Sequence, residues 1–281
     1  MSDSLTVRYA CLLLALLHSL FLAALHILAG GVFFEALIVR RAAPPSTTRL
    51  RALSWALIAI FVLAPLLFIG RIDAFADLRW SYLTWARVAI ALALVFLLQR
   101  RAHASIAGAL LALALLGTQA ALSRSATLAG SLSQALGDWL HLTLSSAWLG
   151  GMLMLLITLR AERPTLAASA ALVSRFSALA TFCVAGLAIG GIAQAAQFLT
   201  GFDALLTTPF GQALTIKLIL VAFLLGFGAY HSQVVAPQMR RQALRASDAD
   251  AALLRAFRRT LAAEALVSAA LLIAVGALKA A

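Results

Sequence analysis

The sequence predicts an all-α, polytopic membrane helix bundle with about eight transmembrane helices and both termini in the periplasm. Three observations lead there: the chain is 63% hydrophobic and 11% charged, its apolar residues form long runs, and its basic residues gather between those runs. Polar side chains are too few to cover a water-soluble globule, so lipid is the expected solvent. Because no segment is long enough for a separate soluble domain, we expect residues 1–281 to form one integral membrane domain.

Each predicted span is an apolar segment long enough to cross a bilayer as a helix, which takes about 20 residues. These segments lie near residues 9–39, 53–70, 83–98, 104–122, 136–159, 174–199, 211–235 and 258–278. The first is far longer than a signal-peptide core and has no clear cleavage site, so we expect it to be retained as a span. Pro65 predicts a kink near the end of the second.

The formal net charge of +12 would suggest nucleic acid as the partner of a soluble protein. Here arginines concentrate after the first, third, fifth and seventh segments, whereas the intervening connections carry little net positive charge. The positive-inside rule makes the basic connections cytoplasmic, which predicts a multi-pass protein of a bacterial inner membrane and no nucleic-acid partner. The arginines concerned are Arg40, Arg41, Arg49, Arg51, Arg100, Arg101, Arg160, Arg163, Arg240, Arg241, Arg245, Arg255, Arg258 and Arg259.

No motif of a soluble enzyme is present: the sequence lacks a phosphate-binding glycine loop, HExxH, CxxC and Gly-x-Ser-x-Gly. We therefore expect a protein that is not an enzyme. The cysteines, Cys11 and Cys183, both lie in apolar runs. They are expected to be small buried hydrophobic residues, with a soft-metal ligand as the alternative, chiefly for Cys11.

The stretch from Asp138 to Gly151 is the richest in polar and small residues. Asp138 and His141 are three residues apart at the predicted outer end of the fifth segment, so they share a helical face. They could coordinate a metal ion or hydrogen-bond each other; alternatively, Asp138 caps the helix and His141 lies at the membrane interface. Trp148, seven residues beyond His141, is expected on the same face. Gly150 and Gly151 are expected to allow close approach of another helix or a ligand, or to serve packing with Trp148.

Two histidines, His18 and His26, lie within the first segment. Eight residues separate them by about 12 Å along a helix, so they cannot both bind one ion directly. Either they mark two stations on a path, or one is a ligand while the other hydrogen-bonds a neighbouring helix. Met152 and Met154 would suit soft metal ions but point to different helix faces, so at most one faces a given site.

Two opposite charges are expected at similar depth toward the cytoplasmic side, Arg175 in the sixth segment and Glu264 in the eighth. A charge buried in lipid is costly unless paired, so we expect Arg175 and Glu264 to form a structural ion pair. Lys217 is placed near the outer end of the seventh segment, where its side chain could snorkel to the headgroups.

In this order and spacing, the anchors over about residues 130–270 resemble the copper resistance protein D (CopD/PcoD) family of bacterial inner-membrane proteins. They are His141 with Trp148-Leu-Gly-Gly151, Arg175-Phe-Ser177, the Pro209–Lys217 segment, Pro237-Gln-Met239 and Glu264. The chain departs from the family pattern at Ser123-Arg124-Ser125-Ala126, where the family often has Gly-His-Ala. It departs again at Tyr230-His231-Ser232, where the family often has Asn-Arg.

The resemblance implies copper homeostasis or resistance, with copper moved across the inner membrane and import toward the cytoplasm favoured. It also implies a small periplasmic copper-binding partner of the CopC type. His141, Asp138, His18 and His26 are then the candidate copper ligands. Two other hypotheses stay open: a b-type haem or quinone electron-transfer protein, which would need two histidines at one depth on facing helices, and a membrane partner subunit that transports nothing.

Overall fold

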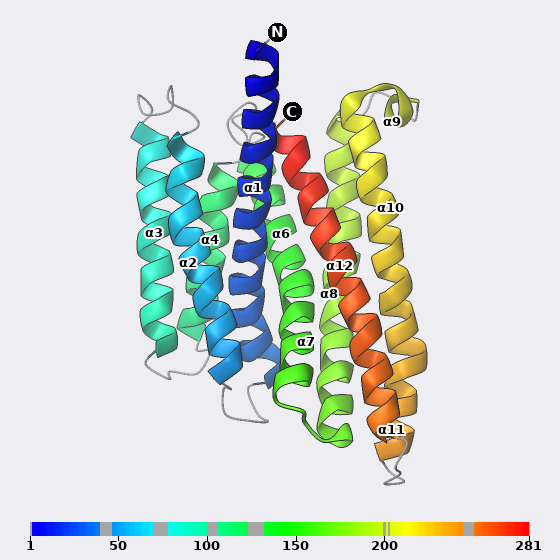
Figure 1. Ribbon diagram of the computed structural model, residues 1–281. Helices are drawn as coiled ribbons and strands as arrows, with labels where there is room; N and C mark the ends of the chain where they lie inside the picture. Colours follow the sequence, from blue (N-terminus) through cyan, green and yellow to red (C-terminus); the bar gives the residue numbers. More distant parts are fainter. Residues whose placement is uncertain are drawn as a thin grey trace.

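The computed structural model describes residues 2–39, 47–69, 78–99, 106–122, 132–198, 201, 203–243 and 250–280. Within these ranges all regular structure is helical, as predicted, and eight long segments alternate in direction (Figure 1). They are α1 (Ser2–Phe34), α2 (Thr47–Ile69), α3 (Leu78–Gln99), α4 (Ile106–Ala121), α6 (Leu132–Ser145) continued by α7 (Gly151–Ala161), α8 (Leu166–Phe198), α10 (Pro209–Tyr230) continued by α11 (Ala236–Ala243), and α12 (Asp250–Ala280); a short α9 (Ala204–Thr207) precedes α10.

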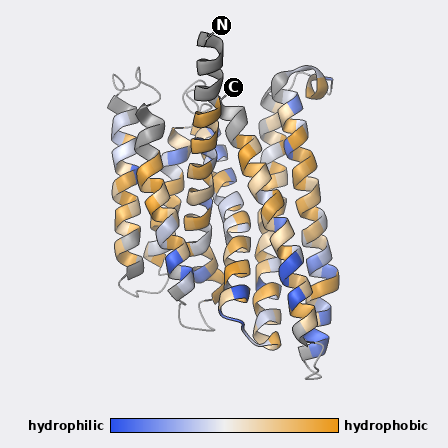
Figure 2. Ribbon diagram, viewed as in Figure 1, coloured by the Kyte–Doolittle hydropathy of each residue, from blue (hydrophilic) through white to orange (hydrophobic). Residues whose placement is uncertain are grey.

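Four of the described helices are both long and apolar enough to cross a membrane: Leu12–Val39, Leu132–Ala161, Leu166–Ala193 and Gly211–Gln242. Shorter apolar helices cover Arg51–Leu63, Ser81–Leu94 and Ile106–Ala121. Large apolar side chains are exposed around the bundle, including Trp55, Ile189 and Leu266 at 70–73%, and Figure 2 shows hydrophobic residues along most of the helix surfaces. The protein is therefore a polytopic helical membrane bundle, and the count of eight spans stays a prediction.

The helix ends carrying most arginines lie together. The start of α2, the end of α7 and α11 all lie at the end of the bundle opposite the start of α1 and the end of α12 (Figure 1). Arg49, Arg160 and Arg240 belong to these three ends. This matches the alternation expected from the sequence, while the side of the membrane on which each end lies stays a prediction.

The core is built around α1, which packs against α2, α4, α7 and α12. Phe21, Leu25 and Leu28 on α1 are fully buried, as is Met154 on α7. Because α1 is covered on several sides, its polar side chains face protein as well as lipid.

Three π-helical turns interrupt the described helices: η1 (Glu35–Val39), η3 (Ser146–Gly150) and η4 (His231–Val235). A π turn inserts an extra residue into the helical repeat and changes which residues share a face. Trp148 lies within η3, so its seven-residue spacing from His141 is not that of an uninterrupted α-helix. Met152 and Met154, just beyond η3, are both buried.

Candidate functional site

The α1 helix and η3 meet at two glycines. A Cβ atom built on Gly150 would overlap the carbonyl oxygen of His26, and one built on Gly30 would lie 2.6 Å from the Gly150 Cα. Trp148, two residues before Gly150 in the same π turn, is buried. Gly151 faces a different helix, since a Cβ there would lie 3.0 Å from a ring carbon of Phe176 on α8. The glycine pair predicted from sequence thus lies where two other helices approach closely.

His26 lies at this crossing and is 5% exposed. Its Nδ1 is 2.7 Å from the carbonyl oxygen of Leu22, and its Nε2 is 3.1 Å from the hydroxyl of Ser145 at the end of α6. A carbonyl oxygen only accepts, so Nδ1 carries a hydrogen, while the Ser145 hydroxyl that faces Nε2 donates its own hydrogen to the carbonyl oxygen of Leu142 at 3.1 Å. The structure therefore places the His26 imidazole at a buried contact between α1 and the end of α6.

A second hydroxyl lies in the same turn. Ser146 is fully buried, and its hydroxyl makes no hydrogen bond. Buried hydroxyls normally have a partner, so an unsatisfied one beside His26 and Ser145 marks this turn as a polar place within an apolar bundle.

His141 and Asp138 lie nearer the start of α6. His141 precedes Ser145 by four residues, so both side chains lie on one face, with His141 about 6 Å nearer the start of the helix. Asp138 lies near enough to Lys217 on α10 for their charges to interact. On α1, the ring centroid of His18 is 6.4 Å from that of Phe21.

The candidate ligands do not converge on one point. Among the residues that the structure describes, no three His, Cys, Asp or Glu side chains come together in a group that could hold a metal ion. Cys183 is a free, buried thiol on α8, and the side chain of Cys11 lies outside the described residues, as do Ser123–Ala126. The candidate donor atoms are therefore spread along the bundle. They suit an ion that contacts one or two of them at a time, not one closed metal centre.

A buried arginine, Arg87, lies close to His18. Arg87 on α3 is 5% exposed, and its guanidinium carbon lies 5.0 Å from the ring centroid of Phe21, the neighbour of His18. Its Nε donates to the hydroxyl of Thr118 at 3.3 Å. This residue was not singled out in the sequence, although an arginine inside an apolar run is the signal that could have found it.

The expected ion pair between Arg175 and Glu264 is not formed. Arg175 Nη1 donates instead to the carbonyl oxygen of Ile38 at 3.1 Å, whereas Glu264 Oε2 lies 3.1 Å from His231 Nδ1. The physical reason is that Ile38 lies at the end of η1, where helix carbonyls lack intrahelical partners and attract a cation. The expectation rested on Arg175 and Glu264 lying at a similar depth in the membrane. Depth alone does not show whether an arginine bonds to a backbone carbonyl or to a carboxylate.

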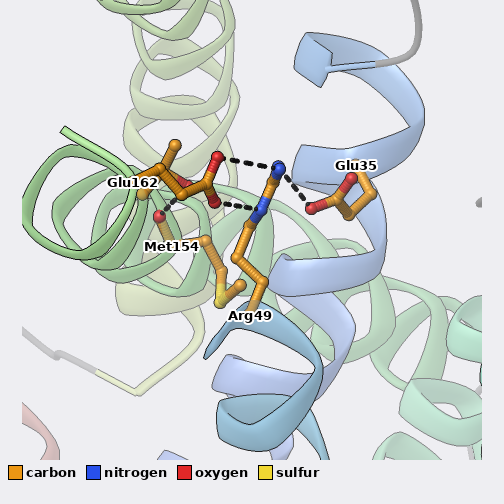
Figure 3. A network of polar contacts seen from close by, with 5 residues as sticks. Glu35, Arg49, Met154 and Glu162 are labelled. Atoms are coloured by element: carbon orange, nitrogen blue, oxygen red, sulfur yellow. Dashed lines mark hydrogen bonds and ion pairs between the residues drawn. The ribbon is translucent and has the colours of Figure 1, made fainter. Parts of the chain in front are cut away.

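Arg49 forms a network that the sequence does not predict, because the apolar pattern places Arg49 in a basic connection between two spans. It is 1% exposed, its Nη1 donates to Glu35 at 2.8 Å, and its Nε lies 2.7 Å from Glu162 (Figure 3). A further bond joins Nη2 to Glu162 at 3.1 Å, so this pairing is bidentate. The network ties η1, α2 and the end of α7 together beside Met154. The signal available in the sequence was the scarcity of glutamates: Glu35, Glu162 and Glu264 are the three in the chain.

A protein-family model matches part of the second half of the chain. Residues 170–278 match the family model of copper resistance protein D. The chain is 34% identical over 105 residues to the copper transport protein CutJ of Bacillus subtilis (strain 168), covering 37% of this chain and 19% of that protein. It is also 34% identical over 113 residues to the inner membrane protein YebZ of Escherichia coli (strain K12), covering 38% of this chain and 37% of that one.

These matches thus span well under two thirds of either relative, and no solved structure matches the chain. The helical membrane bundle, the matched family model and the two relatives nevertheless agree with each other. Residues 170–278, from α8 to α12, are therefore similar to the copper resistance protein D family, and the chain is a multi-pass helical membrane protein.

Proposed function

We propose that this protein moves copper across the bacterial inner membrane, with import toward the cytoplasm favoured. The observation that carries the proposal is His26, whose imidazole lies at the buried contact between α1 and the end of α6. These two helices bear the other candidate ligands, His18, Asp138 and His141. The name of one relative, a copper transport protein, supports the same reading.

The candidate ligands lie at successive depths. Both α1 and α6 start at the same end of the bundle and run in the same direction (Figure 1). His26 lies opposite Ser145, and distances along the helix axes are counted from that level. His141 is then about 6 Å closer to the start of the helices, and His18 about 12 Å closer. Asp138 lies at a depth similar to that of His18. An ion entering from that end would meet His18 and Asp138, then His141, then His26.

The donor types suit copper as a transported ion. Imidazole nitrogens bind both common oxidation states, and thioethers favour Cu(I). Met152 and Met154 are buried just below the α1–η3 crossing, so sulfur ligands would follow the histidines in the inward direction. Delivery to the outer end by a small periplasmic CopC-type copper-binding protein would complete the route.

Cellular copper content tests the proposal directly. Copper should be measured at controlled external concentrations in cells with and without the full chain, and we expect more intracellular copper in cells that carry it. Unchanged copper content despite normal membrane insertion would contradict transport and favour a non-transporting subunit. The visible spectrum of the purified protein separates the electron-transfer alternative, because bound haem would give a Soret band.

A further inference from the structure

A hydrogen-bonded chain joins η4 to α12. His231 is 6% exposed and Glu264 is 3% exposed. His231 Nδ1 lies 3.1 Å from Glu264 Oε2, and His231 Nε2 lies 2.9 Å from the hydroxyl oxygen of Thr260. The imidazole also packs edge-on against Phe257, with ring centroids 5.0 Å apart. The polar atoms of this chain are therefore enclosed by protein.

Thr260 decides which imidazole nitrogen carries a hydrogen. Its hydroxyl donates to the carbonyl oxygen of Phe257 at 2.9 Å. A hydroxyl has one hydrogen, so the same oxygen must accept from His231, and Nε2 must be the donor. In a neutral imidazole with hydrogen on Nε2, Nδ1 has only a lone pair.

The contact between His231 and Glu264 then needs a hydrogen of its own. A bare Nδ1 and an ionised carboxylate at 3.1 Å would set two lone pairs against each other. One additional proton removes the conflict, either on Nδ1 as an imidazolium–carboxylate pair or on Oε2 as a neutral acid hydrogen-bonded to the ring. Both forms leave the buried pair with no net charge, which a low-dielectric surrounding favours.

We propose that His231 and Glu264 form a proton-binding site within the membrane, which holds one proton between Nδ1 and Oε2. The proton ties the state of this site to the position of η4 against α12. If the two residues separate, either the proton leaves or a charge is left buried, and an unpaired charge at membrane depth costs several kcal/mol.

Charged residues on the surrounding elements do not pair with Glu264 among the described side chains. On α8, Arg175 donates to Ile38, and on α11, Arg240 donates to Ser174. On α12, Arg258 lies near Arg160 and Arg163, while Arg255 and Arg259 lie nearer the start of the helix than Glu264. Among the described side chains, His231 is the only cationic or titratable group within ion-pair distance of Glu264.

The proton can be located spectroscopically in the full chain. We suggest labelling the protein with ¹³C-glutamate and ¹⁵N-histidine in lipid nanodiscs and combining infrared with nuclear magnetic resonance spectra. Glu35 and Glu162, both paired with Arg49, provide internal ionised references. We expect either a carboxylic acid at Glu264 or a doubly protonated ring at His231, and neither in Glu264→Gln protein. An ionised Glu264 beside a singly protonated His231 at neutral pH would overturn the proposal.

Thr260→Val tests the part played by the hydroxyl. Without that acceptor, the ring can carry its single hydrogen on Nδ1 and donate to an ionised Glu264, so at neutral pH the spectra of the variant should show a singly protonated His231 beside an ionised Glu264. Thr158→Val is the matched control, because that buried hydroxyl bonds only to Met154 within its own helix. Wild-type spectra from folded Thr260→Val protein would refute the hydrogen assignment. If that variant does not fold, the wild-type spectra alone decide.

Discussion

Gly30 and Gly150 touch backbone to backbone, and this contact fixes the crossing of α1 and η3. A Cβ on Gly30 would lie 2.6 Å from the Gly150 Cα, and one on Gly150 would overlap the backbone of His26. Neither obstacle is the end of a flexible side chain, so a methyl group can be accommodated only if the helices move apart.

Gly150→Ala should therefore destabilise the folded protein. Overpacking a tight contact costs about 1–3 kcal/mol, and rigid backbone on both sides places this site at the upper end. The measurement is the thermal unfolding midpoint in detergent. Gly190→Ala is the matched control, since a Cβ there meets nothing within 4 Å, and it should leave the midpoint unchanged or raise it. Equal midpoints for the two variants would mean that the helices do not cross at Gly150.

Arg49→Gln should destabilise the protein more than any other arginine replacement at this end of the bundle. It would leave Glu35 and Glu162 facing each other without their cation, and removing one partner of a buried ion pair costs about 3–5 kcal/mol. Arg51→Gln is the control, because Arg51 lies on the same helix with an exposed side chain. Unfolding midpoints that fall equally in both variants would contradict a buried network.

Much of the fold follows from two coarse properties of the sequence. Long apolar runs require helices in lipid, because only intrahelical bonds satisfy the backbone there, and clustered arginines mark alternate ends. These features account for the long helices and for the common end that holds Arg49, Arg160 and Arg240. They average over many residues, so a local change of conformation does not disturb them.

The site was less predictable because it depends on single residues. Trp148 lies inside a π turn, and the apolar pattern around it does not reveal that turn. Arg49 looks like a loop arginine until the fold brings Glu35 and Glu162 to it. Similar depth suggested a partner for Glu264, but depth does not specify position around the bundle, and His231 occupies the place expected for Arg175.

The corrected pairing predicts a pattern of energetic coupling. His231→Gln and Glu264→Gln should be non-additive, with an interaction energy of about 0.5–3 kcal/mol, as for residues in direct contact. Arg175→Gln and Glu264→Gln should add, because Arg175 bonds to Ile38 instead. Double-mutant cycles on unfolding midpoints measure both. A large coupling between Arg175 and Glu264 would restore the ion pair expected from the sequence.

The membrane orientation is predicted to be periplasmic at both termini. The basic connections after α1, α3, α7 and α11 should face the cytoplasm because translocation of clustered arginines is unfavourable. A reporter enzyme that is active only in the periplasm should be active when fused after Ala281. A fusion after Arg163, between α7 and α8, should be inactive in the same assay. The reverse result at either site would mean a different number of spans.

His141→Ala should abolish copper-dependent accumulation without reducing insertion or expression. His141 lies on the face of α6 that leads inward to Ser145 and His26, so its loss would interrupt the proposed succession of ligands near its outer end. Asp138→Asn should have a smaller effect, because the amide keeps an oxygen donor while Lys217 loses its nearby charge. Thr143→Ala is the matched control on the same helix, since that hydroxyl donates only to Trp139 within α6. Cellular copper content and membrane abundance should be measured together for all three. Wild-type copper content with well-inserted His141→Ala protein would remove His141 from the route and favour the non-transporting subunit.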